Sequence, residues 1–184
     1  MLSVGITLET ERLTLRPCTG SDIEAFAAML ADSEVMRFLA IDGKPMPRFG
    51  AWQSLCSTVG HWALRGFGMF AVVERASGRF VGRVGPWYPE DWPGFEIGWT
   101  LRSEDWGKGY ATEAADRCLT YAFSELGQAH VISLIHPENV RSIRVAERLG
   151  ERLEGHVTLP HSPDSPVQQY GLSREAWLRR GPLR

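Results

Sequence analysis

The sequence predicts an α/β protein, or α+β by some conventions, with a mixed, mostly antiparallel sheet and helices on both faces. The first observation is size: 184 residues, 43% hydrophobic and 23% charged, suit one globular domain spanning residues 1–184. The second is the order of predicted elements, β-α-α-β-β-β-α-β-α-β-β. Hairpins toward both ends and a single β-α-β crossover between them require antiparallel and parallel strand pairs in one sheet.

The N-terminal part predicts a strand followed by a helix. Residues 8–17 alternate apolar and polar positions, as a half-buried strand does. Ser21 and Glu24 have the spacing of a capping box, so a helix is expected to begin there. The apolar side chains of that helix share one face at helical spacing, namely Ile23, Phe26, Ala27 and Leu30.

A loop, a second helix and a hairpin come next. Residues 35–50 contain glycine and two prolines, which favours a loop, and a helix is expected over about 49–64. Two apolar runs then flank Ala76, Ser77 and Gly78, and turn residues between two such runs predict a β-hairpin.

The centre of the chain predicts a strand, a glycine loop and a long helix. Residues 95–101 are a short apolar and aromatic run that reads as a buried strand, and Gly127 stands where a left-handed residue would end the helix. The apolar face of this helix repeats at helical spacing through Ala111, Ala114, Ala115, Cys118, Leu119, Ala122, Phe123 and Leu126.

The C-terminal part predicts a strand, a capped helix and a last pair of strands. Residues 130–137 are rich in β-branched side chains and end at a proline, as a strand would. Asn139 is the candidate N-cap of the following helix, and Gly150 is its C′ residue. The last two strands, 151–159 and 168–173, flank a Pro/Ser loop at 160–166.

The glycine loop before the long helix is a candidate anion site. The first turn of a helix leaves backbone N–H groups unpaired, and the helix dipole adds partial positive charge there. Gly107 and Gly109 lack Cβ atoms, so a phosphate could approach these groups closely. A tight turn with no ligand explains the same two glycines equally simply.

Other nucleotide motifs and several partner classes are not indicated. The third glycine of a G-x-G-x-x-G fingerprint is missing, about a hundred residues precede the loop, and no Walker A loop is present. A net charge of −2 without a Lys/Arg block disfavours nucleic acid and anionic membranes. Three scattered cysteines favour neither disulfides nor a zinc site, so no metal is expected. No apolar run or basic leader suggests a membrane span or export, so a cytoplasmic location is expected.

Two motifs resemble the GCN5-related N-acetyltransferases, most of all the branch that holds ribosomal-protein N-terminal acetyltransferases. They are DWGKGYATEA, residues 105–114, and HPENVRSIRVAERLG, residues 136–150. LETERLTLRP near the start and YGLSREAW near the end are also similar to that branch. The resemblance implies acetyl-coenzyme A as donor, an amine as acceptor and direct transfer in a ternary complex. It also implies a splayed central pair of strands.

The resemblance implies where the coenzyme would lie. Backbone N–H groups of the glycine loop would hold its pyrophosphate, and Asn139 would contact it as well. The exposed main chain of the strand at 95–101 would pair with the pantetheine arm, and a bulge is expected at Gly98. The groups involved belong to Ile97, Trp99, Leu101, Gly107, Lys108, Gly109, Tyr110, Ala111 and Thr112.

Acetyl transfer to an amine needs a base for the amine and an acid for the departing thiolate. Glu96 is the best-placed candidate base, although a solvated carboxylate at a strand edge is an equal reading. Weaker candidates are Glu90, Asp91 and His136. A strand N–H near Ile97 or Gly98 would stabilise the oxyanion. Many relatives place a Tyr acid at the position of Ala146, so the resemblance here leaves Ser142 as the acid.

The acceptor stays open at the level of sequence. Trp87, Tyr88, Trp92 and Phe95 could line an acceptor pocket, close a homodimer or only pack together. A peptide N-terminus and a small-molecule amine fit equally well. A coenzyme-binding sensor or scaffold without turnover is the alternative function, because only Glu96 and Ser142 indicate chemistry. Glu151 stands where the resemblance expects an aromatic residue.

Overall fold

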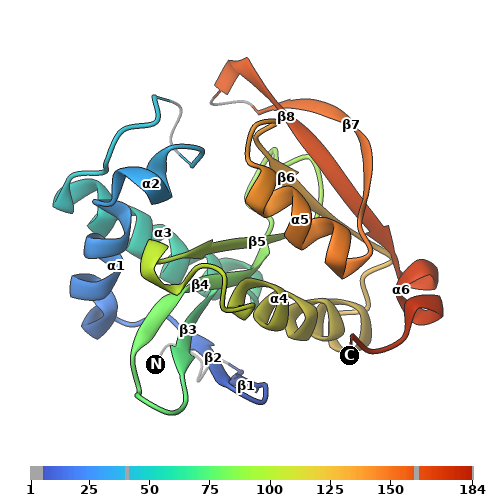
Figure 1. The fold of residues 1–184 in the computed structure, drawn as a ribbon, viewed down its shortest axis with the longest axis horizontal. Helices are drawn as coiled ribbons and strands as arrows, with labels where there is room; N and C mark the ends of the chain where they lie inside the picture. Colours follow the sequence, from blue (N-terminus) through green and yellow to red (C-terminus); the bar gives the residue numbers. More distant parts are fainter. Residues whose placement is uncertain (1–5, 40–41, 160–161, 184) are drawn as a thin grey trace.

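The fold is one eight-stranded sheet with helices on both faces, seen in a computed structural model that describes residues 6–39, 42–159 and 162–183 (Figure 1). Within these residues the strand order is β1-β2-β3-β4-β5-β6-β8-β7. The predicted mixed and mostly antiparallel sheet is therefore confirmed. The strands are β1 Leu8–Glu9, β2 Leu13–Pro17, β3 Phe70–Glu74, β4 Phe80–Trp87, β5 Glu96–Leu101, β6 His130–Ile135, β7 Arg152–Leu159 and β8 Ser162–Ser173.

Helices cover both faces of the sheet, as alternate residues of β3 show. Phe70 and Val72 pack in the same core as Leu119 of α4, whereas Ala71 between them packs with Phe26 of α1. Among the described helices, none combines the length and apolarity needed to cross a bilayer. The helices are α1 Ile23–Leu30, α2 Ser33–Met36, α3 Arg48–Arg65, α4 Tyr110–Thr120, α5 Val140–Leu149 and α6 Arg174–Arg180.

The sheet splays open between β5 and β6. These two strands are the parallel pair, and their register contains one pair of residues, Glu96 with Ile132. β4 and β5, by contrast, are paired along the whole of β5, from Gly82 with Leu101 to Trp87 with Glu96. Figure 1 shows β7 and β8 rising at the right while β1–β3 lie at the bottom of the view. The expected splayed pair of strands is present, and it opens a cleft in the middle of the sheet.

The long helix after the glycine loop is confirmed, with one irregularity. α4 continues into a π-helical turn, Tyr121–Glu125, before Gly127 ends it with φ of 68°. The predicted caps of α5 are also confirmed: the Asn139 side chain accepts a hydrogen bond from the Ser142 N–H, and Gly150 has φ of 86°. The helix therefore starts and stops where the sequence indicates.

Two N-terminal predictions are wrong in detail. The single strand over 8–17 is a tight hairpin of β1 and β2, because the chain reverses at residues 10–12 and the Thr10 N–H donates to the Leu13 carbonyl. The capping box lies two residues earlier than expected. Asp22 accepts from the Thr19 N–H at 2.7 Å and also binds Arg16, whereas Glu24 pairs with Arg48 instead.

Three further segments differ from the prediction. The loop expected over 35–50 begins inside α2, whose Val35 and Met36 are buried against α1 and α3. The loop expected over 160–166 is replaced from Ser162 onward by β8, and residues 160 and 161 lie outside the described residues. The helix α6 was not predicted; Ser173 caps it by accepting from the Ala176 N–H.

Candidate active site

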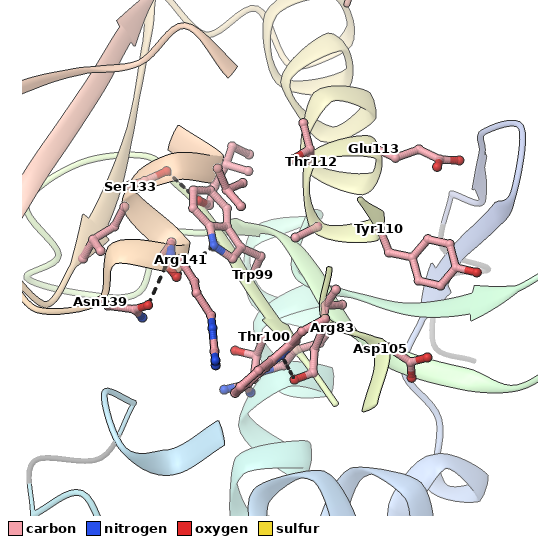
Figure 2. A pocket seen from close by; sticks show the side chains of 18 of the residues that line it. Arg83, Trp99, Thr100, Asp105, Tyr110, Thr112, Glu113, Ser133, Asn139 and Arg141 are labelled. Carbon is pink, nitrogen blue, oxygen red and sulfur yellow. Dashed lines mark hydrogen bonds between the residues drawn. The ribbon is translucent and has the colours of Figure 1, made fainter. Parts of the chain in front are cut away.

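A cleft of about 2000 Å³ occupies the gap between β5 and β6. Its walls include β5, the glycine loop with the start of α4, the end of β6, the start of α5 and the segment after α2, and parts of β4, α3 and the β1–β2 turn also line it. In Figure 2 the side chains of Asn139 and Arg141 lie on one side and the start of α4 on the other. All the residues that the sequence predicts for coenzyme binding line this cleft, as do the first-choice base Glu96 and acid Ser142, so the fold brings them together.

The glycine loop presents unpaired N–H groups to the cleft. Gly107 and Gly109 have φ of 77° and 82°, and Gly109 is the N-cap of α4. Left-handed angles like these favour glycine over any residue with a Cβ atom. Among the described residues, no acceptor bonds the N–H groups from Gly107 to Thr112, and the first helical bond is that of Glu113 N to Gly109 O at 3.1 Å. The arrangement suits an anion such as a pyrophosphate.

The side chains of this loop are tied down away from its mouth. The carboxylate of Asp105, fully buried, accepts two hydrogen bonds of 2.8 Å from Arg79 and one of 2.8 Å from the Lys108 ammonium. Arg12 donates to the Lys108 carbonyl at 3.0 Å and pairs with Glu113. Figure 2 shows Tyr110 and Glu113 pointing away from the cleft. Lys108 can therefore contribute its backbone N–H but not its charged head.

The open edge of β5 offers main-chain groups of alternate residues. The Ile97 carbonyl accepts from the Ser133 hydroxyl at 2.8 Å, and the Leu101 carbonyl accepts from Trp106 Nε1 at 3.0 Å. Trp99 lies between them and faces the same way, with no strand partner on that side among the described residues. An extended arm could pair with Trp99, with one carbonyl on either side already satisfied by a side chain.

The bulge expected at Gly98 is absent from the pairing with β4, whose register runs through Gly85 with Gly98 without a shift. Gly98 is needed for a different reason. A Cβ atom there would lie 2.7 Å from the Met69 Cε and 3.4 Å from a Glu96 oxygen. The glycine therefore leaves room for the Met69 side chain next to the Glu96 carboxyl.

Glu96 is at the first position of β5, on the floor of the cleft. Burial raises the pKa of its carboxyl to about 7, against the opposing effects of hydrogen bonds from Trp92 and the Leu134 N–H and of the charge of Arg83. Trp92 Nε1 donates to its Oε2 at 2.7 Å. A carboxyl with this pKa can both take and release a proton near neutral pH, which is what a general base for an amine requires.

The three weaker candidate bases are placed less well. Glu90 is exposed in an ion pair with Arg65, and neither it nor Asp91 lines the cleft. His136 does line the cleft and stacks on Phe38. Its Nδ1 accepts from the Glu138 N–H at 3.2 Å, which leaves the proton of the neutral ring on Nε2. Of these carboxylates and imidazoles, Glu96 alone is both in the cleft and poised as an acceptor.

Ser142 lies across the cleft from β5, at the start of α5. Its N–H donates to Asn139 Oδ1 at 3.2 Å, and its hydroxyl oxygen accepts from Trp99 Nε1 at 3.2 Å (Figure 2). The helix cap fixes the backbone, and the indole fixes the oxygen, so the hydroxyl proton is directed elsewhere. Asn139 keeps its amide donors, which have no partner among the described residues. Ala146 is buried, so a tyrosine acid at that position is not available.

Glu151 is a buried carboxyl beneath the cleft. It is 3% exposed, and its Oε1 lies 3.1 Å from the Ser133 hydroxyl that also meets the Ile97 carbonyl. Burial raises its pKa to about 8. The acid is therefore protonated at neutral pH and can donate to Ser133, which then donates to Ile97. This chain of two hydrogen bonds connects the start of β7 to β5 through β6.

Trp92, Ser133 and Arg83 were missed by sequence reasoning. Trp92 was noted only as one of several clustered aromatics, and Ser133 as part of an apolar strand. Arg83 is on β4, opposite Thr100 of β5, and lines the cleft. The available signal for Arg83 was a charged residue inside a strand otherwise made of apolar residues and glycine.

Cysteine chemistry is not provided in the cleft. Within the described residues no cysteine lines it. Burial raises the pKa of the Cys18 thiol to about 12 and that of Cys118 further still, whereas Cys56 is exposed on α3. The cleft thus offers a carboxyl and hydroxyls rather than a thiolate nucleophile.

Comparison with known proteins agrees with this geometry. The family model described as "Acetyltransferase (GNAT) domain" matches residues 12–152. The FsC-acetyl coenzyme A-N(2)-transacetylase of Aspergillus fumigatus is 31% identical, over 94% of this chain and 78% of its own. A crystal structure of an acetyltransferase from Agrobacterium tumefaciens is 29% identical, with a TM-score of 0.80 over 91% of this chain and 94% of its own. The ribosomal-protein-S5-alanine acetyltransferase of Vibrio fischeri, 19% identical, shares the fold with a TM-score of 0.70 over 94% and 98% of the two chains.

Proposed function

Since the chain belongs to the GNAT acetyltransferase family and is an acetyl-coenzyme A-dependent N-acetyltransferase, we propose that it acetylates a primary amine by direct transfer in the β5–β6 cleft. The observation that carries this proposal is the position of Glu96. A carboxyl whose pKa is about 7 lies in the same cleft as a helix N-terminus with unpaired N–H groups. Acid–base chemistry and anion binding therefore meet in one site.

The residues present fit the coenzyme. The N–H groups from Gly107 to Thr112 would hold the pyrophosphate, and the main chain of Ile97, Trp99 and Leu101 would pair with the pantetheine arm. The Asn139 amide lies where it can donate to the same molecule. When bound, acetyl-coenzyme A supplies the acetyl group as an activated thioester. The chain itself supplies orientation, since binding along β5 brings the thioester end toward Glu96.

Glu96 would accept the proton of the acceptor amine, directly or through one water. An α-amine has a pKa near 8, so at neutral pH the base removes a proton from a partly charged nucleophile. Trp92 donates to one carboxylate oxygen at 2.7 Å and the Leu134 N–H also donates to the carboxyl, so the amine would use one of the remaining lone pairs. A main-chain N–H of β5, at Ile97 or Gly98, would donate to the oxygen that gains charge in the transition state.

Ser142 would donate its proton to the departing thiolate. Trp99 Nε1 occupies one lone pair of its oxygen, and the hydroxyl keeps its proton to donate. A thiol has a pKa near 8.5, so the thiolate leaves tolerably well and the acid contributes modestly. The absence of a cleft cysteine among the described residues supports direct transfer over an acetyl-thiol enzyme.

The acceptor is a protein N-terminus or a small-molecule amine. The motifs at residues 105–114 and 136–150 support the ribosomal-protein N-terminal acetyltransferase branch. The Aspergillus relative, by its name an N(2)-transacetylase, supports a small-molecule acceptor. The test therefore includes acceptors of both classes, peptide N-termini and small-molecule amines. A homodimer and a cytoplasmic location are compatible with three free cysteines and stay predictions from the sequence.

The test measures acetyl transfer to a panel of peptides and small amines, and the free thiol of the released coenzyme A is the readout. We expect acetylation of at least one class and thermal stabilisation by acetyl-coenzyme A but not by ATP or NAD. Stabilisation without transfer to any amine would favour the alternative, a coenzyme-binding sensor or scaffold. A shift that ATP or NAD reproduces would overturn coenzyme binding itself.

A further inference from the structure

Arg83 stands on the same side of the sheet as the proposed base. In the β4–β5 register Arg83 is opposite Thr100, and Trp87 is opposite Glu96. Thr100 and Glu96 are four residues apart on one strand, so their side chains leave the same face. Arg83, Thr100 and Glu96 all line the cleft, and Figure 2 shows Arg83 and Thr100 below Trp99. An acceptor that reaches Glu96 from this side would pass Arg83.

The guanidinium of Arg83 makes its side-chain contacts to neutral groups and has no ion pair among the described residues. Its Nη1 donates to Ser54 Oγ at 3.2 Å and lies 3.5 Å from Thr58 Oγ1, both on α3. Its Cζ is 5.2 Å from the centre of the Phe26 ring. Its Nε is buried with no partner, and Nη2 has none among the described residues. Two other arginines that line the cleft differ in this respect, because Arg12 is paired with Glu113 and Arg117 with Glu125.

Arg83 is partly buried, and a cation that is partly removed from water without a paired anion is stabilised when an anion binds beside it. Burial lowers the pKa of Arg83 from its usual value, although an arginine stays charged at any physiological pH. The negative charge of Glu96 only partly compensates for it, because no ion pair joins the two side chains within the described residues. The fork of the guanidinium matches a carboxylate, and the Ser54 hydroxyl beside it can add a donor.

Resting on the proposed function, we infer that the acceptor carries a carboxylate as well as its amine, and that Arg83 binds the carboxylate while the amine meets Glu96. One guanidinium among neutral hydroxyls balances one negative charge, which favours a carboxylate over a doubly charged phosphate. Two-point binding would fix the orientation of the amine toward the thioester. A carboxylated amine is therefore the substrate class that this cleft selects.

The test uses a homologous series of ω-amino acids and their carboxamides. Replacing the remote carboxylate by an amide removes the charge and leaves the amine almost unchanged in basicity. We expect wild type to prefer the acid by about 10- to 100-fold in kcat/KM, the usual range for a charged hydrogen bond. Arg83→Met should bring the acid-to-carboxamide ratio close to one, and Arg83→Lys should restore part of it.

The control is Arg179→Met, which removes an exposed arginine of α6 that does not line the cleft and should keep the wild-type ratio. A wild-type ratio near one overturns the inference. So does an Arg83→Met enzyme that loses acid and carboxamide activity in parallel, which is what a purely structural role would give. Calorimetric binding of the same acids and carboxamides needs no turnover. It therefore tests Arg83 even if no amine is acetylated, an outcome that would count against the proposed function instead.

Discussion

Trp99 Nε1 donates a hydrogen bond to Ser142 Oγ at 3.2 Å, across the gap that separates β5 from α5. The indole has no other polar group, so the bond has one possible direction. The hydroxyl proton of Ser142 is not used in this bond and is available for another acceptor. The same bond also connects β5 to α5 across the cleft.

Ser142→Ala should lower kcat with little change in coenzyme affinity. General acid catalysis is typically worth about 10²–10⁴-fold, and a thiolate needs little help to leave, so we expect a loss at or below about 10²-fold. Trp99→Phe should cost less, because it removes the orienting donor and keeps the acid. The measurements are steady-state kinetics and calorimetry with acetyl-coenzyme A. Wild-type kcat in Ser142→Ala would show that the serine only follows the helix cap.

Glu96→Gln should lower turnover more than Ser142→Ala, and most strongly near neutral pH. The raised pKa of about 7 means that the base form of Glu96 gains population as pH rises through that value. Wild-type kcat/KM should therefore climb below about pH 7 and level off above it. The variant should recover as the pH approaches the amine pKa near 8, where the nucleophile is already neutral.

Trp92→Phe is the matched variant for the base. The Trp92 hydrogen bond favours the charged carboxylate, so its loss should raise the pKa of Glu96 and move the acidic limb of the pH–rate profile upward. An unshifted limb would mean that another group controls it. If Glu96→Gln kept wild-type turnover over about pH 6 to 9, positioning alone would explain the catalysis.

Glu151→Gln should stabilise the protein at higher pH. Since the pKa of Glu151 is raised in the folded state to about 8, the folded chain holds a proton that the unfolded chain releases. The contribution of protonated Glu151 to the free energy of unfolding is fully present below about pH 4.5. It decreases by about 1.4 kcal/mol per pH unit as the pH rises to about 8. Glutamine keeps a donor for Ser133 and cannot ionise.

Urea unfolding of wild type and Glu151→Gln across this pH range gives the measurement. Glu96, whose raised pKa acts in the same direction, is present in both proteins, so the difference between them reports on Glu151 together with its interaction with Glu96. Glu151→Ala should be destabilising at every pH, because Ser133 then loses its donor in the interior. A constant difference between wild type and Glu151→Gln would show that the buried carboxyl does not change ionisation on folding.

Gly109→Val should weaken coenzyme binding by about tenfold or more while the fold persists. Gly109 has φ of 82°, and a left-handed angle costs a residue with a Cβ atom about 1–3 kcal/mol. A Cβ atom at Gly109 would lie 3.4 Å from Arg12 Nη2, the side chain that binds the Lys108 carbonyl. The substitution therefore acts through backbone strain and through Arg12, and not by filling the space of the phosphate. If the backbone relieves that strain by changing conformation, the N–H groups of the glycine loop no longer point together at the anion site.

Gly127→Val controls for the strain itself. Gly127 has φ of 68°, nothing lies near its Cβ position, and it does not line the cleft. The Gly127→Val variant should lose about as much stability as Gly109→Val, measured by thermal unfolding, and should keep its coenzyme affinity, measured by calorimetry. Equal affinity losses in the two variants would assign the effect to global destabilisation.

Elements with strong local signals could be predicted from the sequence. The caps of α5 need only Asn139 and Gly150, and the apolar face of α4 repeats over four turns, so both were found. The failures lie where tertiary contacts decide. Asp22 caps the earlier turn because Arg16 of β2 holds it there, and the sequence carries no sign of that partner. α6, by contrast, has a capping serine, and it was not predicted because its apolar pattern is only two turns long.

The candidate site divides in the same way. Its coenzyme side is local, a loop and two helix starts, and could be located from motifs and the resemblance. Its acceptor side is assembled from distant strands. Arg83 and Glu96 share one face of the sheet only because β4 and β5 pair in one register, and Trp92 reaches Glu96 only because the intervening chain turns back. Spacing along the sequence does not encode either arrangement.

The single Glu96–Ile132 pair between β5 and β6 has a consequence for the lifetime of the protein in a cell. The pantetheine arm, bound along β5, would act as an additional strand between β5 and β6 that is present only when the coenzyme is bound. A ligand present at a hundred times its Kd adds about 2.7 kcal/mol to the free energy of unfolding. Proteolysis often acts on transiently opened chains, so abundance would follow the supply of the acetyl donor. A cell short of acetyl-coenzyme A would then lose the enzyme as well as its substrate.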